Sequence, residues 1–374
     1  MRICSPQLGI SPQSILGGEI YDRQILKYLA ELGNRVDIIL PLFKPHEQVK
    51  NWHVHHVPVP FVVPPHLYNF LVLPYLFYLY KQLSFDILRI HSPTFLGIAV
   101  TIFKKVHPHV PIVGIYHWLG EGGMAEKWIN PMVINHFDAI ICDSLYTRKQ
   151  IEKTYSQTKG KVYAIHNGVD EVLILQKKPP HLINKFQINK STVVLLFMGL
   201  FINRKNPLFL LPIVKTIIQK YPSVLMLYCG KGPLEHKLKQ EIQNLHLSKH
   251  VQIIPPVFGV DKNDLFNLAD IFVHPAIQEG FSLSVIEAMA VGLPVIITDG
   301  FSAGEVVINH INGFLCKTPK DWLRQTQTLI TDKNLREKMS QENIKIVKRK
   351  FKWKNVAEKH QLIFNRLVHE QRRK

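Results

Sequence analysis

Residues 274–290 read HPAIQEGFSLSVIEAMA and place two carboxylates, Glu279 and Glu287, eight residues apart around a turn. The residues at 270–274 form a short apolar run bounded by turn residues, which predicts a buried strand. Ser282 can cap a helix that begins at the next residue, and free N–H groups at such a helix end suit a phosphate. We therefore expect Glu279 on the loop and Glu287 inside the helix to reach groups on opposite sides of a bound diphosphate.

The rest of the chain alternates short apolar runs with helical patterns, twice over. Most of the runs are β-branched and continuous, as strands buried on both faces of a parallel sheet must be. This alternation predicts an α/β protein with two doubly wound parallel sheets, which bind ligands beyond the carboxyl ends of their strands. Strands are expected at 2–4, 36–40, 86–90, 112–115, 139–142, 162–165, 192–198, 224–229, 251–254, 271–274, 294–298 and 313–315, with helices between them, for instance at 20–32, 207–220 and 234–245.

The length of 374 residues suits two domains of ordinary size. The stretch 176–181 is charged and then proline-rich, which predicts a linker. We therefore expect an N-terminal domain over residues 1–176 and a C-terminal domain over residues 181–352. The final stretch, 353–374, has a basic helical pattern.

The net charge is +18, from 46 Lys and Arg against 28 Asp and Glu. Such a surplus favours anionic partners, namely nucleic acid, an acidic membrane face or phosphorylated substrates. No basic-aromatic repeat, zinc-finger spacing or helix-turn-helix pattern accompanies the charge, so we expect no nucleic-acid partner. The histidines His53, His55 and His56 share one strand-like run without a carboxylate or cysteine, which favours a polar edge strand over a metal site.

The four cysteines are far apart, and each lies in or beside an apolar strand-like run. This pattern predicts buried free thiols rather than disulfides or a metal site. Residues 1–4 read as a strand, with no charged leader before an apolar core. Both observations favour a cytoplasmic protein.

Residues 279–290 resemble the Glu-Gly-Phe-Gly-x-x-x-x-Glu-Ala-Met-Ala signature of the family-four retaining glycosyltransferases, with Ser282 at a position that is usually glycine. The resemblance extends over nearly the whole chain. It implies the GT-B fold, in which two Rossmann-like domains face a central cleft and the last helix, here 353–374, crosses back to the first domain. It also implies transfer of a sugar, with retention, from a nucleotide-diphosphate sugar to a glycan, lipid-linked or small-molecule acceptor hydroxyl.

Several positions in the first half of the chain match this family. The turn LGGE at 16–19 corresponds to the glycine turn that faces the donor phosphates, and paired glycines let the backbone approach a ligand closely. His117 corresponds to a position beside the donor sugar, and His91 and Glu19 to the acceptor side. Both histidines end strand-like runs, so they would lie at the cleft-facing edge of the sheet.

The second half departs from the family in one loop. Lys205 stands where a lysine neutralises the diphosphate, but Leu200 occupies the usual arginine position and Asn206 the usual glycine position. Either Arg204 supplies the missing cation, or the diphosphate is held with one fewer contact. The turn CGKGP at 229–233 resembles the glycine turn that lines the nucleotide cleft.

The resemblance gives each group a role. Glu287 accepts hydrogen bonds from the ribose, Glu279 from the transferred sugar, and the leaving phosphate oxygen takes the proton of the acceptor. No Asp-x-Asp pair occurs, so neither a metal nor another cofactor is expected besides the nucleotide-sugar substrate. The expected catalytic residues are Glu279 and His117, the donor-binding residues are Gly17, Gly18, Gly199, Arg204, Lys205, Gly230, Gly232, Gly280, Phe281, Ser282, Leu283 and Glu287, and the acceptor-side residues are Glu19 and His91.

Two other functions are compatible with the sequence. A nucleotide-sugar epimerase or hydrolase of the same architecture would consume the donor without an acceptor, although the NGVD run at 167–170 and the signature at 279–290 favour a transferase. Leu200 leaves room for a non-catalytic nucleotide-sugar-binding protein, against which the retained pair of glutamates argues. Dependence of donor turnover on an acceptor separates the first from a transferase, and binding without turnover identifies the second.

Residues 61–80 carry no Lys, Arg, Asp or Glu and are rich in Leu, Phe and Tyr. A spanning helix needs ~20 apolar residues, and three prolines interrupt this run, so it is not expected to span a membrane. Two interpretations stay open: a core helix under the first sheet, or a partly exposed helix with its tyrosines at a lipid interface. In the second case the protein would bind peripherally to the anionic inner face of the membrane, with head groups near Lys81, Lys104 and Lys105.

Overall fold

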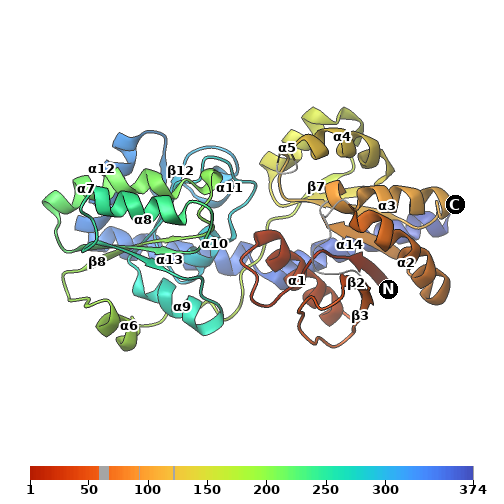
Figure 1. The fold of residues 1–374 in the computed structure, drawn as a ribbon, viewed down its shortest axis with the longest axis horizontal. Coiled ribbons are helices and arrows are strands. Elements are labelled where there is room, and N and C mark those ends of the chain that lie inside the picture. Colours follow the sequence, from red (N-terminus) through yellow and green to blue (C-terminus); the bar gives the residue numbers. More distant parts are fainter. Residues whose placement is uncertain (59–66, 92, 121–122, 374) are drawn as a thin grey trace. The chain divides into compact units, whose positions relative to one another are not determined.

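The computed structural model describes residues 1–58, 67–91, 93–120 and 123–373. The chain forms two compact units, which can be followed in Figure 1. Unit 1 consists of Met1–Asn167 and Trp353–Lys374, and unit 2 consists of Gly168–Lys352. The chain therefore leaves unit 1 once and returns to it for its last helix.

Unit 1 is built on a parallel sheet with the strand order β3-β2-β1-β4-β5-β6-β7. The order reverses between β1 and β4, which makes this the switch point of the sheet. The strands are β1 Arg2–Pro6, β2 Arg35–Pro41, β3 Trp52–Val57, β4 Ile87–His91, β5 Ile112–Tyr116, β6 Ala139–Cys142 and β7 Val162–Ala164, and the α-helices are α1 Gly17–Glu31, α2 Tyr68–Leu83, α3 Pro93–Val106, α4 Gly123–Val133, α5 Leu145–Thr154 and α14 Trp353–Arg372.

Unit 2 is built on a second parallel sheet, with the order β10-β9-β8-β11-β12-β13 and its switch point between β8 and β11. The strands are β8 Val193–Met198, β9 Val224–Cys229, β10 Val251–Ile254, β11 Ile271–His274, β12 Val295–Thr298 and β13 Gly313–Cys316. The α-helices are α6 Pro180–Lys185, α7 Leu210–Lys220, α8 Glu235–Asn244, α9 Gly259–Leu268, α10 Leu283–Ala290, α11 Ala303–Val306, α12 Pro319–Thr331 and α13 Lys333–Lys350.

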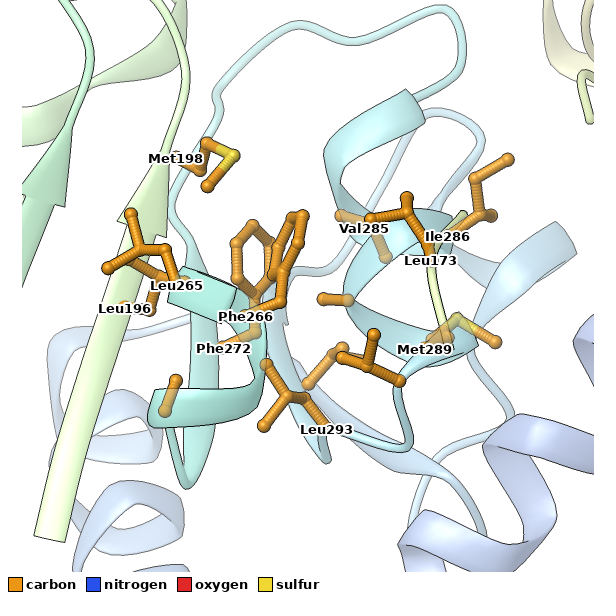
Figure 2. Close-up of a cluster of buried hydrophobic side chains, with 14 of the residues drawn as sticks. Leu173, Leu196, Met198, Leu265, Phe266, Phe272, Val285, Ile286, Met289 and Leu293 are labelled. Carbon is orange, nitrogen blue, oxygen red and sulfur yellow. The ribbon is translucent and has the colours of Figure 1, made fainter. Parts of the chain in front are cut away.

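The central strand of unit 2 buries both of its faces. Leu196 and Met198 on β8 belong to one buried cluster with Ile286 and Met289 of α10, as Figure 2 shows. Phe197, between them in the sequence, belongs to a second buried cluster. Full burial of a large apolar side chain stabilises a fold by about 1.5–3 kcal/mol, so both faces contribute. Burial on two faces explains why the strand runs of the sequence are continuous rather than alternating.

The two predicted doubly wound parallel sheets are confirmed, and every predicted strand is present with its ends shifted by no more than two residues. The histidine-rich run became β3, which lies at the edge of its sheet, as predicted. All four cysteines are buried and free, also as predicted.

The chain passes into unit 2 after Asn167, earlier than the linker expected at 176–181. Unit 2 holds the connecting residues, because Leu173 is buried in its core and the N–H of Gln176 donates to Asn267 Oδ1 at 2.6 Å. The charge and prolines of 176–181 therefore belong to a segment of unit 2. At the other end, α14 belongs to unit 1 and packs on α1.

α2 forms the described part of the apolar stretch 61–80, whose residues 61–66 lie outside the described residues. The helix continues through Pro74. Val72 and Leu76 are buried in the core of unit 1, whereas Phe70 and Tyr78 are 70% and 58% exposed. The stretch therefore contributes to both the core and the surface. Within the described ranges, no helix is long and apolar enough to cross a membrane.

Candidate functional site

Two loops of unit 2 follow the neighbouring strands β8 and β11, at the switch point of the sheet. Open parallel sheets bind ligands outside the carboxyl ends of their strands at such a point. The β8 loop carries Arg204 and Lys205, and the β11 loop carries Glu279. The N–H of Ile277 donates to the carbonyl oxygen of Arg204 at 2.9 Å, which joins the two loops.

Glu279 is the centre of a charged cluster. Its Oε2 forms an ion pair with Lys205 and lies 3.3 Å from His274 Nε2. Its Oε1 lies 3.2 Å from Arg204 Nη1. Burial by itself would raise the pKa of Glu279, but Lys205 and then His274 and Arg204 outweigh it and lower the pKa from 4.5 to about 2. The carboxylate is therefore ionised at neutral pH and holds two cations close to one another.

The loop that departs from the family pattern has a clear geometry. Arg204 and Lys205 lie in one short 3-10 helix, Asn203–Lys205, and both side chains reach Glu279. Arg204 therefore lies beside Lys205 on the same carboxylate, while position 200 carries a leucine. Asn206 has a φ of 51°, in the left-handed region that glycine adopts readily and asparagine tolerates better than most residues, which explains how it replaces a glycine.

Ser282 precedes α10 with an extended backbone, at φ −94°, as expected for a helix cap. Its side chain does not form the predicted cap. Instead its Oγ lies 3.2 Å from His274 Nε2 and 3.2 Å from Ser284 Oγ. His274 is only 3% exposed, and a buried ring nitrogen needs a hydrogen-bonding partner, so the hydroxyl is directed there. Burial, and next Lys205, lower the pKa of His274.

Three predicted glycines hold the loops after β8 and β9 in close backbone contact. A Cβ on Gly230 would lie 1.9 Å from the carbonyl oxygen of Gly199, and a Cβ on Gly232 would lie 2.6 Å from that of Phe201. The N–H of Phe201 donates to the carbonyl oxygen of Lys231 at 3.0 Å. No larger residue fits at 230 or 232 without moving backbone, so these glycines shape the β8 side of the switch point.

The remaining predicted residues of the β11 loop connect the cluster to the core. Phe281 is 6% exposed, and its ring centroid lies 5.9 Å from that of Phe351. Gly280 lies between this anchor and Glu279, and Leu283 is the first residue of α10. The anchored phenylalanine fixes where the loop leaves the core.

Glu287 lies inside α10, as predicted, and is 6% exposed. Lys262 Nζ on α9 lies 2.6 Å from Glu287 Oε1. This lysine was not predicted from the sequence. A signal was available, because Lys262 is in the first turn of a helix, where the positive helix end disfavours a cation unless an anion lies nearby.

At the switch point of unit 1, the predicted site residues Gly18, His91 and His117 lie close together. Gly17 and Gly18 begin α1, which follows β1, and His91 ends β4. A Cβ on Gly18 would lie 2.9 Å from His91 Cε1 and 3.6 Å from His117 Cδ2. The two imidazole rings have centroids 5.2 Å apart. Glu19, in the first turn of α1, lies against Gly9, where a Cβ would be 2.3 Å from its Oε1.

Each of these histidines has a carboxylate behind it that sequence analysis did not assign. Asp22 Oδ2 lies 2.5 Å from His91 Nδ1, and Asp143 Oδ2 lies 3.3 Å from His117 Nδ1. A signal for Asp22 was present, because it falls on the apolar stripe of α1 with Ile25, Leu26 and Leu29, where a carboxylate needs a buried partner.

That partner is Arg89 of β4, whose Nη2 forms an ion pair with Asp22 Oδ1; both side chains are 0% exposed. Behind them, Tyr21 OH lies 3.0 Å from Nε2 of His360, which α14 contributes. Burial lowers the pKa of His360 well below its ordinary value. The predicted site residues therefore fall into two sets, one in each unit. Among the residues described, no group of three or more His, Cys, Asp or Glu could hold a metal ion.

Two family models match the chain. The model described as "Glycosyl transferases group 1" matches residues 180–346, and the model described as "Glycosyltransferase Family 4" matches residues 15–172. An uncharacterized glycosyltransferase of Methanocaldococcus jannaschii is 25% identical over 318 residues, which are 82% of this chain and 82% of that protein.

Two further likenesses concern function and fold. The UDP-Gal:alpha-D-GlcNAc-diphosphoundecaprenol alpha-1,3-galactosyltransferase of Escherichia coli is 26% identical over 257 residues, 64% of each chain. The structure of sucrose-phosphate synthase from Thermosynechococcus elongatus superimposes with a TM-score of 0.85 over 99% of both chains at 17% identity. That likeness and the two parallel-sheet units confirm the GT-B fold.

Proposed function

The chain belongs to the group 1, family-four glycosyltransferases, and from this membership we propose that it moves a sugar, with retention, from a nucleotide-diphosphate sugar to an acceptor hydroxyl. The observation that carries the proposal is the cluster of unit 2. Two cations, Arg204 and Lys205, meet the carboxylate of Glu279 at the switch point, where a bound diphosphate would find positive charge beside a hydrogen-bond acceptor for the sugar.

In the proposed reaction the bond between the anomeric carbon and the leaving phosphate oxygen breaks, and the bond to the acceptor oxygen forms on the same face. The proton of the acceptor passes to the leaving phosphate oxygen. Lys205 and Arg204 stabilise the charge that develops on the diphosphate. Glu279 accepts hydrogen bonds from the transferred sugar, and Glu287 accepts them from the ribose.

A uridine nucleotide sugar and a lipid-linked acceptor are the first substrates to test, because the Escherichia coli relative is named for UDP-Gal and a diphosphoundecaprenol acceptor. We expect UDP, in a panel with GDP and ADP, to raise the melting temperature, since a ligand of the folded state stabilises it by mass action. Transfer from UDP-galactose to N-acetylglucosamine-diphosphoundecaprenol is then measured, with NMR of the anomeric proton to read the stereochemistry.

Three experimental outcomes would contradict the proposed function. Donor consumption at the same rate without acceptor identifies a hydrolase or epimerase. Nucleotide-sugar binding without turnover over a broad acceptor panel identifies a binding protein. An inverted anomeric centre in the product contradicts retention.

Glu287→Gln should weaken binding of UDP, because the carboxylate loses charge-assisted hydrogen bonds to the ribose worth on the order of 1.5–3 kcal/mol. Isothermal titration measures the dissociation constant. Lys262→Gln is the matched control, since it breaks the same 2.6 Å ion pair from the other side and leaves the glutamate in place. Equal losses of affinity in the two variants would mean that only the ion pair matters and that Glu287 does not contact the nucleotide.

We also propose that unit 1 contacts an anionic membrane surface. α3 packs between α2 and α4, and these helices expose large apolar side chains. They also carry the exposed cations Lys81, Lys105 and Lys127, while the carboxylate of these helices, Glu126, is buried. Aromatic and basic side chains together suit a lipid interface. We call this the three-helix surface, and its apolar members are Leu67, just before α2, and Phe70, Leu71, Tyr78, Ile102, Val106, Trp128 and Met132 on the helices.

The protein should co-sediment with phosphatidylglycerol vesicles at low salt, and less at high salt or with phosphatidylcholine, because the attraction is screened. The double variant Phe70→Ser with Trp128→Ser should lose most of this binding. Leu362→Ser is the matched control, since Leu362 is 69% exposed on α14 of the same unit. Absence of binding to anionic vesicles at low salt would exclude membrane contact, and self-association that both serines abolish would assign the surface to a second copy of the chain.

A further inference from the structure

A buried carboxylate lies directly behind the predicted acceptor-side histidine. Asp22 of α1 is 0% exposed and touches two groups of β4, the guanidinium of Arg89 and the imidazole of His91. Burial would raise the pKa of Asp22, but Arg89 and then His91 hold it well below its ordinary value. Asp22 is therefore an ionised acceptor of hydrogen bonds.

The geometry fixes which nitrogen of His91 carries the proton. His91 Nδ1 and Asp22 Oδ2 are both buried and 2.5 Å apart, and neither atom has a hydrogen-bond partner elsewhere in the described part of the chain. Because an ionised carboxylate only accepts hydrogen bonds, this approach requires a proton on Nδ1. In the neutral imidazole Nε2 is then the acceptor. That nitrogen lies on the opposite side of the ring, 3.1 Å from where a Cβ on Gly18 would be. Nε2 of His91 makes no hydrogen bond to any residue that the structure describes.

Arg89 holds the carboxylate of Asp22 in its orientation towards His91. Its guanidinium pairs with Asp22 Oδ1 and leaves Oδ2 for the imidazole, while Arg89 Nη1 lies 3.4 Å from Ser5 Oγ on β1. A second pair lies beside it, in which Asp143 Oδ2 lies 3.3 Å from Nδ1 of His117. The switch point of unit 1 therefore presents two imidazoles, each backed by a carboxylate and each near Gly18.

We propose that Asp22 is a positioning residue, which fixes the tautomer and direction of His91 so that Nε2 accepts a hydrogen bond from a hydroxyl of the acceptor next to the attacking one. The inference rests on the proposed transfer reaction. The direct consequence is an acceptor oriented for attack, while the attacking hydroxyl keeps its own proton for the leaving phosphate oxygen. Misplacing a reacting group by about 1 Å can cost on the order of 100-fold in rate, which sets the expected size of the effect.

Asp22→Asn should lower kcat/KM for N-acetylglucosamine-diphosphoundecaprenol about 100-fold with UDP-galactose as donor, and leave the dissociation constant of UDP unchanged. His91→Asn, which keeps an amide near the Nδ1 position, should lose acceptor turnover to the same extent. His91→Gln, which keeps an amide near the Nε2 position, should retain more of it. In the His91→Gln background, Asp22→Asn should have little further effect, because the two residues act as one.

Asp37→Asn is the matched control. Asp37 is also 0% exposed, and its Oδ1 lies 2.9 Å from His55 Nε2. This pair is away from His91, because Asp37 is on β2 and His55 is on β3. The Asp37→Asn variant should have a changed stability, but an unchanged kcat/KM for the acceptor and an unchanged dissociation constant of UDP. A nitrogen-15 NMR spectrum of the histidines gives a second readout that needs no substrate, in which wild-type His91 should be protonated at Nδ1 and the Asp22→Asn variant should shift towards protonation at Nε2.

The outcomes separate this inference from the proposed function. Wild-type transfer with unchanged acceptor kinetics in Asp22→Asn would overturn the positioning role and leave the transferase standing. A fall in UDP affinity equal to the fall in acceptor turnover would overturn it as well, since Asp22 would then act on the donor. A wild-type His91 protonated at Nε2 would overturn it even if no transfer were detected.

Discussion

Replacing Glu279 by glutamine should lower sugar transfer roughly 10- to 100-fold without weakening the binding of UDP. The carboxylate is proposed to accept charge-assisted hydrogen bonds from the transferred sugar. The amide oxygen of glutamine is neutral, so its hydrogen bonds to the sugar are weaker. In the structure the same carboxylate pairs with Lys205 and Arg204. A diphosphate must therefore compete with Glu279 for these cations, and the substitution removes the competitor.

This expectation is measured by steady-state transfer from UDP-galactose and by titration with UDP. Glu235→Gln is the matched control, because Glu235 pairs with Lys239 at 2.7 Å on the surface of the same unit and should affect neither quantity. Wild-type turnover in the Glu279 variant would remove the residue from the reaction. A large loss of UDP affinity would show instead that Glu279 orders the loop, and the direct role in sugar binding would then be unnecessary.

The strands could be predicted because their burial leaves a local trace in the sequence. Residues buried on two faces of a parallel sheet must be apolar in succession. A short continuous apolar run such as β8, with Leu196, Phe197 and Met198, therefore indicates a buried strand. The edge strand β3 was predictable for the opposite reason, since its histidines are tolerated where one side of the strand is not covered.

The contacts within the site left a weaker trace, because they join residues far apart in the sequence. The meeting of Arg204 with Glu279 depends on strands β8 and β11 being neighbours, although their loops are separated by about 75 residues. Ser282 had the right backbone for a cap, but a distant strand end supplied His274 as a competing partner. Asp22 was detectable as a carboxylate on an apolar helix face, yet its partners Arg89 and His91 could not be named without the sheet order.

The boundary between unit 1 and unit 2 could not be predicted from composition, because it too depends on tertiary packing. Charge and proline at 176–181 indicate exposure, and an exposed segment can lie on a domain as well as between domains. The burial of Val169 and Leu173 in the core of unit 2 decides the matter, and this is a property of tertiary packing.

Lys205→Met should weaken UDP binding by about 10- to 100-fold, and by more than Arg204→Met does. Both side chains reach Glu279, but Lys205 is 13% exposed and Arg204 is 23% exposed. The more buried charge is less screened by water, so its attraction to a diphosphate is stronger. Lys239→Met, on the surface of the same unit, is the matched control and should leave the affinity unchanged.

A pH series tests the same cluster in the absence of ligand. The pKa of Glu279 is lowered from 4.5 to about 2, so its pairing stabilises the fold above pH 4.5 and this contribution is lost as the pH falls towards 2. Lys205→Met removes the strongest of the opposing charges, so the stability difference between wild type and variant should be largest at neutral pH and shrink through that window. A difference that stays constant down to pH 2 would show that Lys205 stabilises unit 2 by packing alone, and that the lysine is not held by an ionised Glu279 before the donor arrives.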